Sequence, residues 1–324
     1  METDMVNITA PMVKELRDKT GAGMMDCKTA LNETGGDMEA AIDWLRKKGI
    51  SKAAKKSGRS AAVGLVGVAV DGRAGVLLEV NAETDFVARN DEFKAFVKDA
   101  SKLALKEGGD LEKLLAAPMG SSTVQQSLTG LVAKIGENMS VRRAAAISVD
   151  PGVVAAYVHN ATSPELGKIG VLVGLKSTGD REKLAALAKQ LAMHVAAASP
   201  LAISPEHLAP EVVERERNVQ AEIARQSGRP ENVIEKMMEG RMRKFYEETV
   251  LLQQTFVIDN ETQVGKVIEK AAKELGAPIT VEAFVRFQVG EGIEKAEADF
   301  ADEVAQMSGT KKKPGDEPDP ANAQ

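Results

Sequence analysis

Apolar residues in the first 50 positions recur at the spacing of an α-helix, in three short groups separated by glycines. Gly21 and Gly23 follow the first group, and a Gly-Gly pair follows the second. Asp37 stands before the third group, where an aspartate can cap the first turn of a helix. Residues 8–49 are therefore predicted to form a bundle of three short helices.

After residue 61 the pattern changes to the alternation that is typical of β-strands. Apolar residues alternate at 66–70 and at 76–80, and Asp71-Gly72 between them favours a hairpin turn. A helical pattern follows from Asp91. Strand-like segments 153–160 and 168–176, with a helical pattern after them, repeat this order. The repetition predicts two related α+β subdomains.

Residues 205–245 carry a helical pattern with dense charge around it. Val212, Val219 and Ile223 have the spacing of a coiled-coil seam, and a turn at 227–230 separates them from a second helical run. Two helices of this kind cannot bury both sides in a globular core, so we expect an antiparallel hairpin that projects from it.

The predicted fold is thus α+β, and we expect eight consecutive segments along the chain. They are a three-helix module (1–50), a basic linker (51–60), core subdomain N (61–150), the first part of core subdomain C (151–204), a helical hairpin or coiled-coil arm (205–246), the second part of subdomain C (247–292), a carboxy-terminal helical module (293–307) and a disordered tail (308–324).

Composition excludes several classes of partner. The chain has 324 residues and a net charge of −6, so it has no general electrostatic attraction to nucleic acid or to an anionic membrane. Aromatic residues make up 3% of the chain, too few for a base-stacking surface. Cys27 is the only cysteine, which rules out an internal disulfide or a cysteine metal site. We expect no cofactor.

The sequence also bears on location. The first residues, Met1 to Asp4, include two acids where a secretory signal needs a basic and then an apolar stretch. No apolar run approaches the length of a membrane span. We therefore expect a cytoplasmic protein without membrane contact.

Motifs for catalysis are missing from the sequence. It contains no phosphate-binding P-loop, no zinc-protease motif and no nucleophile elbow. Of the histidines, His194 falls near the apolar face of a helix, which predicts a packed side chain, and His207 has no ligand-like companion. His159 ends a predicted strand and, taken alone, is predicted to be structural. A binding protein is therefore favoured over an enzyme.

The segment Asn81–Asn90 joins a predicted strand to a predicted helix. It places an acid, Asp85, beside a large ring, Phe86. If Phe86 projects from the turn, it can anchor a partner. If it points inward, it is one more core aromatic, and the residues alone leave the two interpretations with equal weight.

Several longer motifs, in this order, resemble the bacterial elongation factor Ts family. They cover roughly residues 8–307 and are Leu16–Lys28, Thr84–Ala88, Lys134–Asn138, Gln226–Gly228 with Glu239–Met242, and Val289–Lys295. The resemblance implies a guanine-nucleotide exchange factor for the GTPase elongation factor Tu, in its GDP-bound and nucleotide-free states. It implies no direct binding of nucleotide and no chemical catalysis.

The resemblance also implies which residues contact the partner. Asp85 and Phe86 match the pair that is pushed between helices of the GTPase and disturbs its magnesium and the loop around the GDP phosphates, with Thr84 and Val87 beside them. Positions that dock on the GTPase match Arg17, Met24 and Met25 in the three-helix module and His159 in the second subdomain.

Two other functions are compatible with the residues alone. The three-helix bundle resembles ubiquitin-associated modules, and with the projecting arm it would suit a non-catalytic adaptor. Retention of ubiquitin by residues 1–50 would favour that alternative. A metal or cofactor in the purified protein would favour an enzyme of an unrecognised type.

Overall fold

The computed structural model describes residues 8–226 and 230–293. The chain divides into two units, residues 1–291 and 292–324, and the description below concerns the first. The predicted turn at 227–230 lies outside the described residues except for Pro230, and the predicted helix 293–307 lies outside them except for Ile293. The predicted tail lies outside them entirely.

The amino-terminal module consists of α1 (Ala10–Thr20), α2 (Met24–Glu33) and α3 (Met38–Lys56). Leu16, Cys27 and Leu31 are fully buried between the three helices. Asp37 caps α3 by accepting a hydrogen bond from the Ala40 N–H at 2.8 Å. Helix α3 runs through most of the segment that was predicted as a linker; there Ala53 packs against the core of the first subdomain, and Lys52 forms an ion pair with Asp26 at 2.8 Å.

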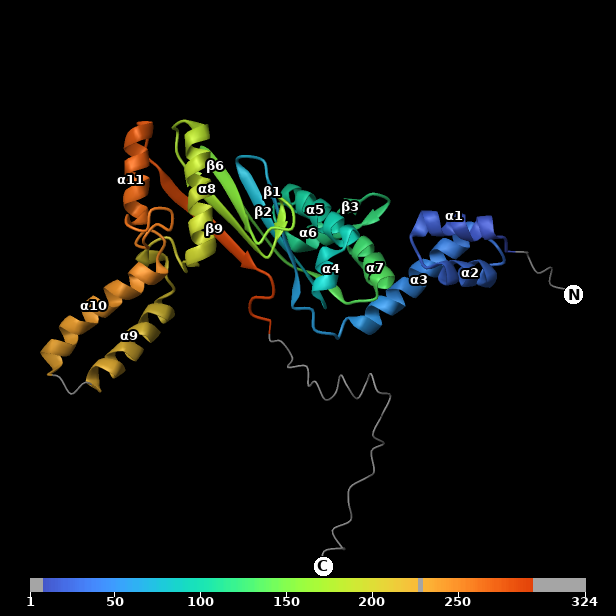
Figure 1. The fold of residues 1–324 in the computed structure, drawn as a ribbon, viewed down its shortest axis with the longest axis horizontal. Coiled ribbons are helices and arrows are strands. Elements are labelled where there is room, and N and C mark those ends of the chain that lie inside the picture. The colour runs from blue at the N-terminus through green and yellow to red at the C-terminus, as the bar shows by residue number, and fades with distance from the viewer. Residues whose placement is uncertain (1–7, 227–229, 294–324) are drawn as a thin grey trace, which may run out of the picture. The chain divides into compact units, whose positions relative to one another are not determined.

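The first sheet is antiparallel, with the strand order β5-β2-β1-β7. Its strands are β1 (Val63–Val70), β2 (Ala74–Ala82), β5 (Met139–Ser148) and the short β7 (Leu166–Gly167). The hairpin between β1 and β2 forms where it was predicted, and Asp71 accepts a hydrogen bond from the Ala74 N–H at 2.7 Å. Helices pack on this sheet, as Figure 1 shows; they are α4 (Asp85–Arg89), α5 (Asp91–Lys106), α6 (Leu111–Ala116) and α7 (Val124–Ile135), with a small ribbon of β3 (Pro118–Met119) and β4 (Ser122–Thr123).

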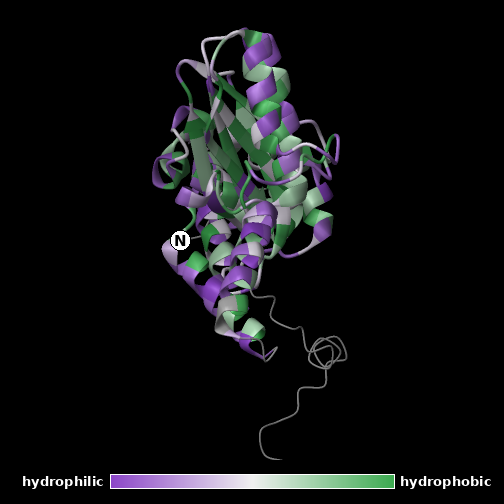
Figure 2. Ribbon diagram, turned by 90° about the vertical axis from the view of Figure 1, so that its left-hand side faces the viewer, coloured by the Kyte–Doolittle hydropathy of each residue, from purple (hydrophilic) through white to green (hydrophobic). Residues whose placement is uncertain are grey.

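The second sheet is also antiparallel and has the order β6-β8-β9. Its strands are β6 (Gly152–His159), β8 (Ile169–Lys176) and β9 (Thr280–Gln288), and it packs against α8 (Arg181–Ala198) and α11 (Val264–Leu275). Strand β7 lies in the connection from β6 to β8, yet it pairs with β1 of the first sheet. In Figure 2, hydrophobic residues concentrate in the strands and polar residues on the outer faces of the helices.

The region predicted as a hairpin contains η1 (Pro205–His207), α9 (Pro210–Arg225) and α10 (Glu231–Thr249), and the two long helices pack against each other. The predicted seam is wrong in detail, because Val212, Val219 and Ile223 are between 38% and 47% exposed. The face of α9 that contacts α10 is partly polar: Gln220 accepts a hydrogen bond from Arg241 at 2.5 Å. The coiled-coil character of the pair stays a prediction.

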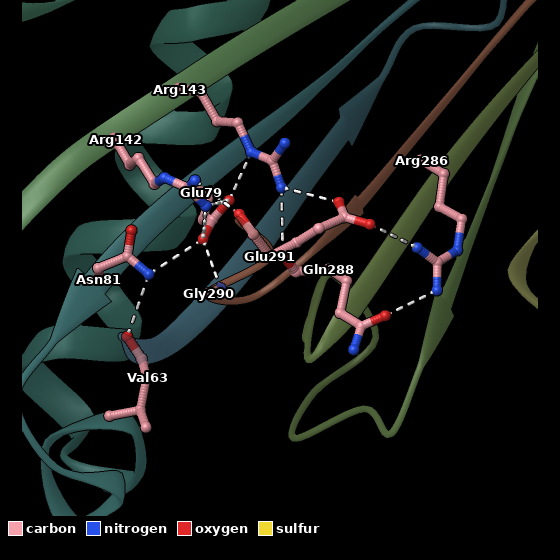
Figure 3. A network of polar contacts seen from close by, with 9 residues as sticks. All are labelled: Val63, Glu79, Asn81, Arg142, Arg143, Arg286, Gln288, Gly290 and Glu291. Atoms are coloured by element: carbon pink, nitrogen blue, oxygen red, sulfur yellow. Dashed lines mark hydrogen bonds and ion pairs between the residues drawn. The ribbon is translucent and has the colours of Figure 1, made fainter. Parts of the chain in front are cut away.

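A buried carboxylate, Glu79 of β2, connects the first sheet to the end of β9 (Figure 3). The pairing of β2 with β5 shifts register at Glu79, and this β-bulge brings two consecutive arginines of β5 onto one carboxylate. Arg143 Nε lies 2.6 Å from Glu79 and Arg142 Nη1 lies 3.1 Å from it. The Gly290 N–H, 211 residues away in sequence, donates to the same carboxylate at 2.8 Å.

The protonation state of Glu79 follows from these contacts. Burial by itself raises the pKa of Glu79, but the Gly290 N–H, the Asn81 amide and the Arg143 guanidinium together hold the pKa below its ordinary value. Because the folded state lowers this pKa, the contacts stabilise the fold above the ordinary glutamate pKa of about 4.3. That contribution is lost as the pH falls through the folded-state pKa.

Glu79→Gln is expected to lower the free energy of unfolding at pH 7 by about 3 kcal/mol, because it removes the buried counter-charge that Arg142 and Arg143 share and leaves Arg143 only its more exposed partner Glu291. Urea unfolding at pH 7 and at pH 3.5 measures this deficit, which should shrink at the lower pH. Asp99→Asn, which removes an exposed partner of Lys102, serves as the control and should change the free energy by less than about 0.5 kcal/mol. An equal deficit for Glu79→Gln at both pH values would contradict this account.

Gly290→Ala is expected to destabilise the protein more than Gly136→Ala does. Both glycines have positive φ, +74° and +84°, so both substitutions carry the backbone strain of a left-handed residue, about 1 kcal/mol. Only at Gly290 would the new Cβ collide with a backbone atom, the carbonyl oxygen of Ala62, 2.1 Å away. Thermal unfolding compares the two variants, and equal midpoints would show that the close approach at Gly290 is unimportant.

Candidate partner-binding site

The turn between β2 and α4 carries the predicted contact residues. Thr84 is the last extended residue before α4, and its side chain does not cap the helix. Instead the Thr84 N–H and O–H both donate to the carboxylate of Glu137, at 3.0 Å and 2.8 Å. Two hydrogen bonds to one carboxylate fix this residue in both position and orientation. The turn is therefore held in place just before Asp85.

Phe86 is exposed, and the two residues after it are buried. Its side chain is 83% exposed, the highest value among the large apolar side chains of the described residues. Val87 and Ala88 are 2% and 3% exposed and belong to the core of the first subdomain. Consecutive buried residues in a single helical turn direct the preceding side chain outward. The structure thus places Phe86 at the surface, whereas Val87 supports the turn from within and offers no surface for contact.

Asp85 forms an ion pair that the sequence did not predict. Its Oδ1 lies 2.6 Å from Nζ of Lys168, which precedes β8 in the second subdomain. The same ammonium group donates to the backbone carbonyl of Gly64 in β1 at 3.2 Å. The turn is therefore connected to the second sheet as well as to the first.

A second group of residues supports the turn from the other side. The Asn138 N–H donates to Glu83 at 2.5 Å, and the Asn138 side chain donates to the Arg59 carbonyl at 2.7 Å. Glu137 and Asn138 belong to the motif Lys134–Asn138, which contributed to the family resemblance without an assigned role. That motif was the feature of the sequence that could have pointed to these supporting residues. Lys168 lies in none of the motifs that carry the resemblance.

His159 ends β6 and is exposed, so it is not a core residue. Its Nδ1 lies 3.2 Å from the hydroxyl of Tyr157. Its backbone carbonyl accepts a hydrogen bond from the N–H of Lys168 at 3.2 Å. Lys168 therefore contacts both Asp85 and His159, which brings these two predicted site residues into one region of the structure. His194, in contrast, is fully buried, which confirms the prediction of a packed side chain. Its Nε2 lies 2.9 Å from the side-chain oxygen of Gln254.

The other predicted docking residues lie on the three-helix module. Met24 and Met25 begin α2 and are 57% and 72% exposed, and Arg17 is exposed on α1. Methionine side chains are flexible and polarizable, so an exposed pair of them suits an adaptable contact surface.

Within residues 8–226 and 230–293, no group of three or more His, Cys, Asp or Glu side chains is arranged to hold a metal ion. None of the helices in the described part of the chain is both long and apolar enough to cross a membrane.

Comparison with known proteins agrees with the sequence motifs. The family model described as "Elongation factor TS" matches residues 83–291. The protein named elongation factor Ts from Parvibaculum lavamentivorans is 61% identical over 303 residues, which is 93% of this chain and 98% of that protein. The one from Rhodospirillum centenum is 59% identical and covers 94% of this chain and 100% of its own length. The one from Rhizobium etli (strain ATCC 51251) is also 59% identical, covering 93% and 98%. The chain therefore belongs to the elongation factor Ts family, whose role is nucleotide exchange in translation elongation.

Proposed function

We propose that the protein is a guanine-nucleotide exchange factor that binds elongation factor Tu in its GDP-bound form and promotes the release of GDP. Membership of the elongation factor Ts family supports this role. The single structural observation that carries the proposal is the exposure of Phe86 on a turn whose neighbouring residues are buried or hydrogen-bonded.

Phe86 is proposed to insert between helices of the GTPase. An aromatic ring offers a large apolar contact area and has only two side-chain torsions to restrict on binding. Because Val87 and Ala88 are buried, the backbone that carries the ring is already ordered, and its ordering costs little when the partner binds. These properties suit a side chain that must separate two packed elements of another protein.

Asp85 is proposed to act beside Phe86 at the magnesium and phosphate region of the GTPase. A bound magnesium ion is the main counter-charge to the phosphates of GDP, so displacing it weakens the hold on the nucleotide. No covalent bond is made or broken in this exchange. The coupling is reciprocal: the factor by which this protein lowers the affinity for GDP is the factor by which GDP lowers the affinity for this protein.

Arg17, Met24, Met25 and His159 are proposed to hold the GTPase while Phe86 inserts. The two methionines are exposed on the three-helix module, and the backbone of His159 is hydrogen-bonded to the residue that pairs with Asp85. These contacts are made on docking, so they should contribute to affinity more than to the maximal rate of release.

Phe86→Ala is expected to reduce the stimulated rate of GDP release by about 30-fold, since a central aromatic contact contributes about 2 kcal/mol. Release of a fluorescent GDP analogue from elongation factor Tu measures this rate. Asp85→Ala should slow release as well. Leu201→Ala removes another exposed apolar side chain, 61% exposed and distant in sequence, and should match the parent protein.

The fold of Phe86→Ala should be intact, with a free energy of unfolding within about 0.5 kcal/mol of the parent, because the ring is exposed. Two results would contradict the proposal. One is release by Phe86→Ala at the parent rate, and the other is a parent protein that does not accelerate release at all.

Met25→Ala is expected to raise the concentration of this protein needed for half-maximal stimulation by about 5-fold, the loss of about 1 kcal/mol of docking energy. The maximal rate should stay unchanged. Ile50→Ala provides a control in the same module, because Ile50 is similarly exposed, at 54%, and is not among the predicted docking residues. A lower maximal rate for Met25→Ala with an unchanged half-maximal concentration would rule out a docking role.

A further inference from the structure

The side chain of Lys168 contacts the turn Thr84–Ala88, which carries Phe86 and is called the Phe86 turn below. Its Nζ lies 2.6 Å from Oδ1 of Asp85 and donates to the Gly64 carbonyl at 3.2 Å. Two acceptors in different elements fix the direction of the ammonium group more closely than the carboxylate alone would. Asp85 is the first residue of α4, so this contact acts on the start of the helical turn that carries Phe86.

The backbone of Lys168 is held on both sides. Its N–H donates to the His159 carbonyl at 3.2 Å, and its own carbonyl accepts from the Val289 N–H at 2.9 Å. The next residue, Gly290, donates its N–H to the buried carboxylate of Glu79. Lys168 therefore has a fixed position relative to both sheets, and its side chain extends from this fixed position to Asp85.

The Phe86 turn has little stability of its own. Helix α4 has five residues, and an isolated helix of that length is not stable in water. Its outer surface includes Asp85 and Phe86, which are both exposed. The charge-assisted contact with Lys168 restrains the exposed side of the turn, as Glu137 restrains Thr84 before it and the core holds Val87 after it.

We propose that Lys168 is a positioning residue for nucleotide exchange: it orients Asp85, and with it the turn that carries Phe86, and it sets the distance of that turn from His159. This inference rests on the proposed function, because orientation of the turn matters only if Asp85 and Phe86 contact the GTPase. Lys168 itself is assigned no contact with the partner.

Lys168→Met tests the inference, since methionine keeps an unbranched stem and removes the charge. The stimulated release of the fluorescent GDP analogue, measured with the full chain at a concentration well below saturation, should slow by about 3-fold to 5-fold, the upper range for one exposed ion pair. Lys168→Arg should recover most of the parent rate, because the guanidinium keeps the charge and the donors.

Lys98→Met is the matched control. Lys98 pairs with Glu165 at 2.8 Å, and both side chains are 44% exposed, so the variant removes a similar ion pair that includes no residue of the Phe86 turn. Its release rate should equal that of the parent. A slowing equal to that of Lys168→Met would mean that the loss of any surface ion pair has this effect, which would overturn the inference.

A double-mutant cycle separates positioning from a general structural role. If Lys168 acts through Asp85, then Lys168→Met should have no further effect on release in an Asp85→Ala background. Full additivity of the two substitutions would overturn the inference. Faster release by Lys168→Met than by the parent would also overturn it, because Lys168 would then mask Asp85 instead of orienting it.

The same experiment distinguishes this inference from the proposed function. A parent rate for Lys168→Met, together with slow release by Phe86→Ala, would reject only the role of Lys168. A parent protein without any effect on GDP release would reject the exchange function itself, and the positioning role with it.

Discussion

The buried carboxylate of Glu79 is the contact on which the geometry of the candidate site depends. It accepts from two arginines of β5 and from the Gly290 N–H at the end of β9. A buried charge of this kind is costly unless every lone pair finds a partner, so the partners have little freedom to move. Val289, the residue before Gly290, donates its N–H to the backbone carbonyl of Lys168, and the side chain of Lys168 forms an ion pair with Asp85. Contacts in the interior thus determine the position of the exposed turn that carries Asp85 and Phe86.

The sequence predicted those parts of the fold that depend on local pattern. The β1–β2 hairpin formed around Asp71, and the helical pattern predicted from Asp91 formed α5, which buries Phe93 and Phe96. In both cases the information lies within a few residues, because turn chemistry and helical spacing are local properties. The end of α3 was predicted too early, since the last turns of the helix contact residues of other elements, through Lys52 with Asp26 and through Ala53 with the core of the first subdomain.

Contacts between distant segments could not be predicted in this way. Glu79 occupies a position in β2 that alternation alone assigns to a polar face, and its burial depends on arginines and a glycine far along the chain. The pair of Lys168 with Asp85 spans 83 residues. For Phe86, the residues left two interpretations with equal weight, and the burial of Val87 and Ala88 decides between them. In α9, the spacing of Val212, Val219 and Ile223 indicated a helix correctly but not which face would be covered.

Strand β7 shows that the repeated order of elements does not produce two separable halves. It belongs to the connection between β6 and β8, but its residues pair with Val66 and Gly67 of β1, and the Val68 N–H donates to Glu165 just before it. A fragment that ended at residue 150 would expose this edge of β1, and an exposed strand edge invites association with other chains. The second half of the polypeptide completes the first, so the duplicated pattern folds as a single interdependent structure.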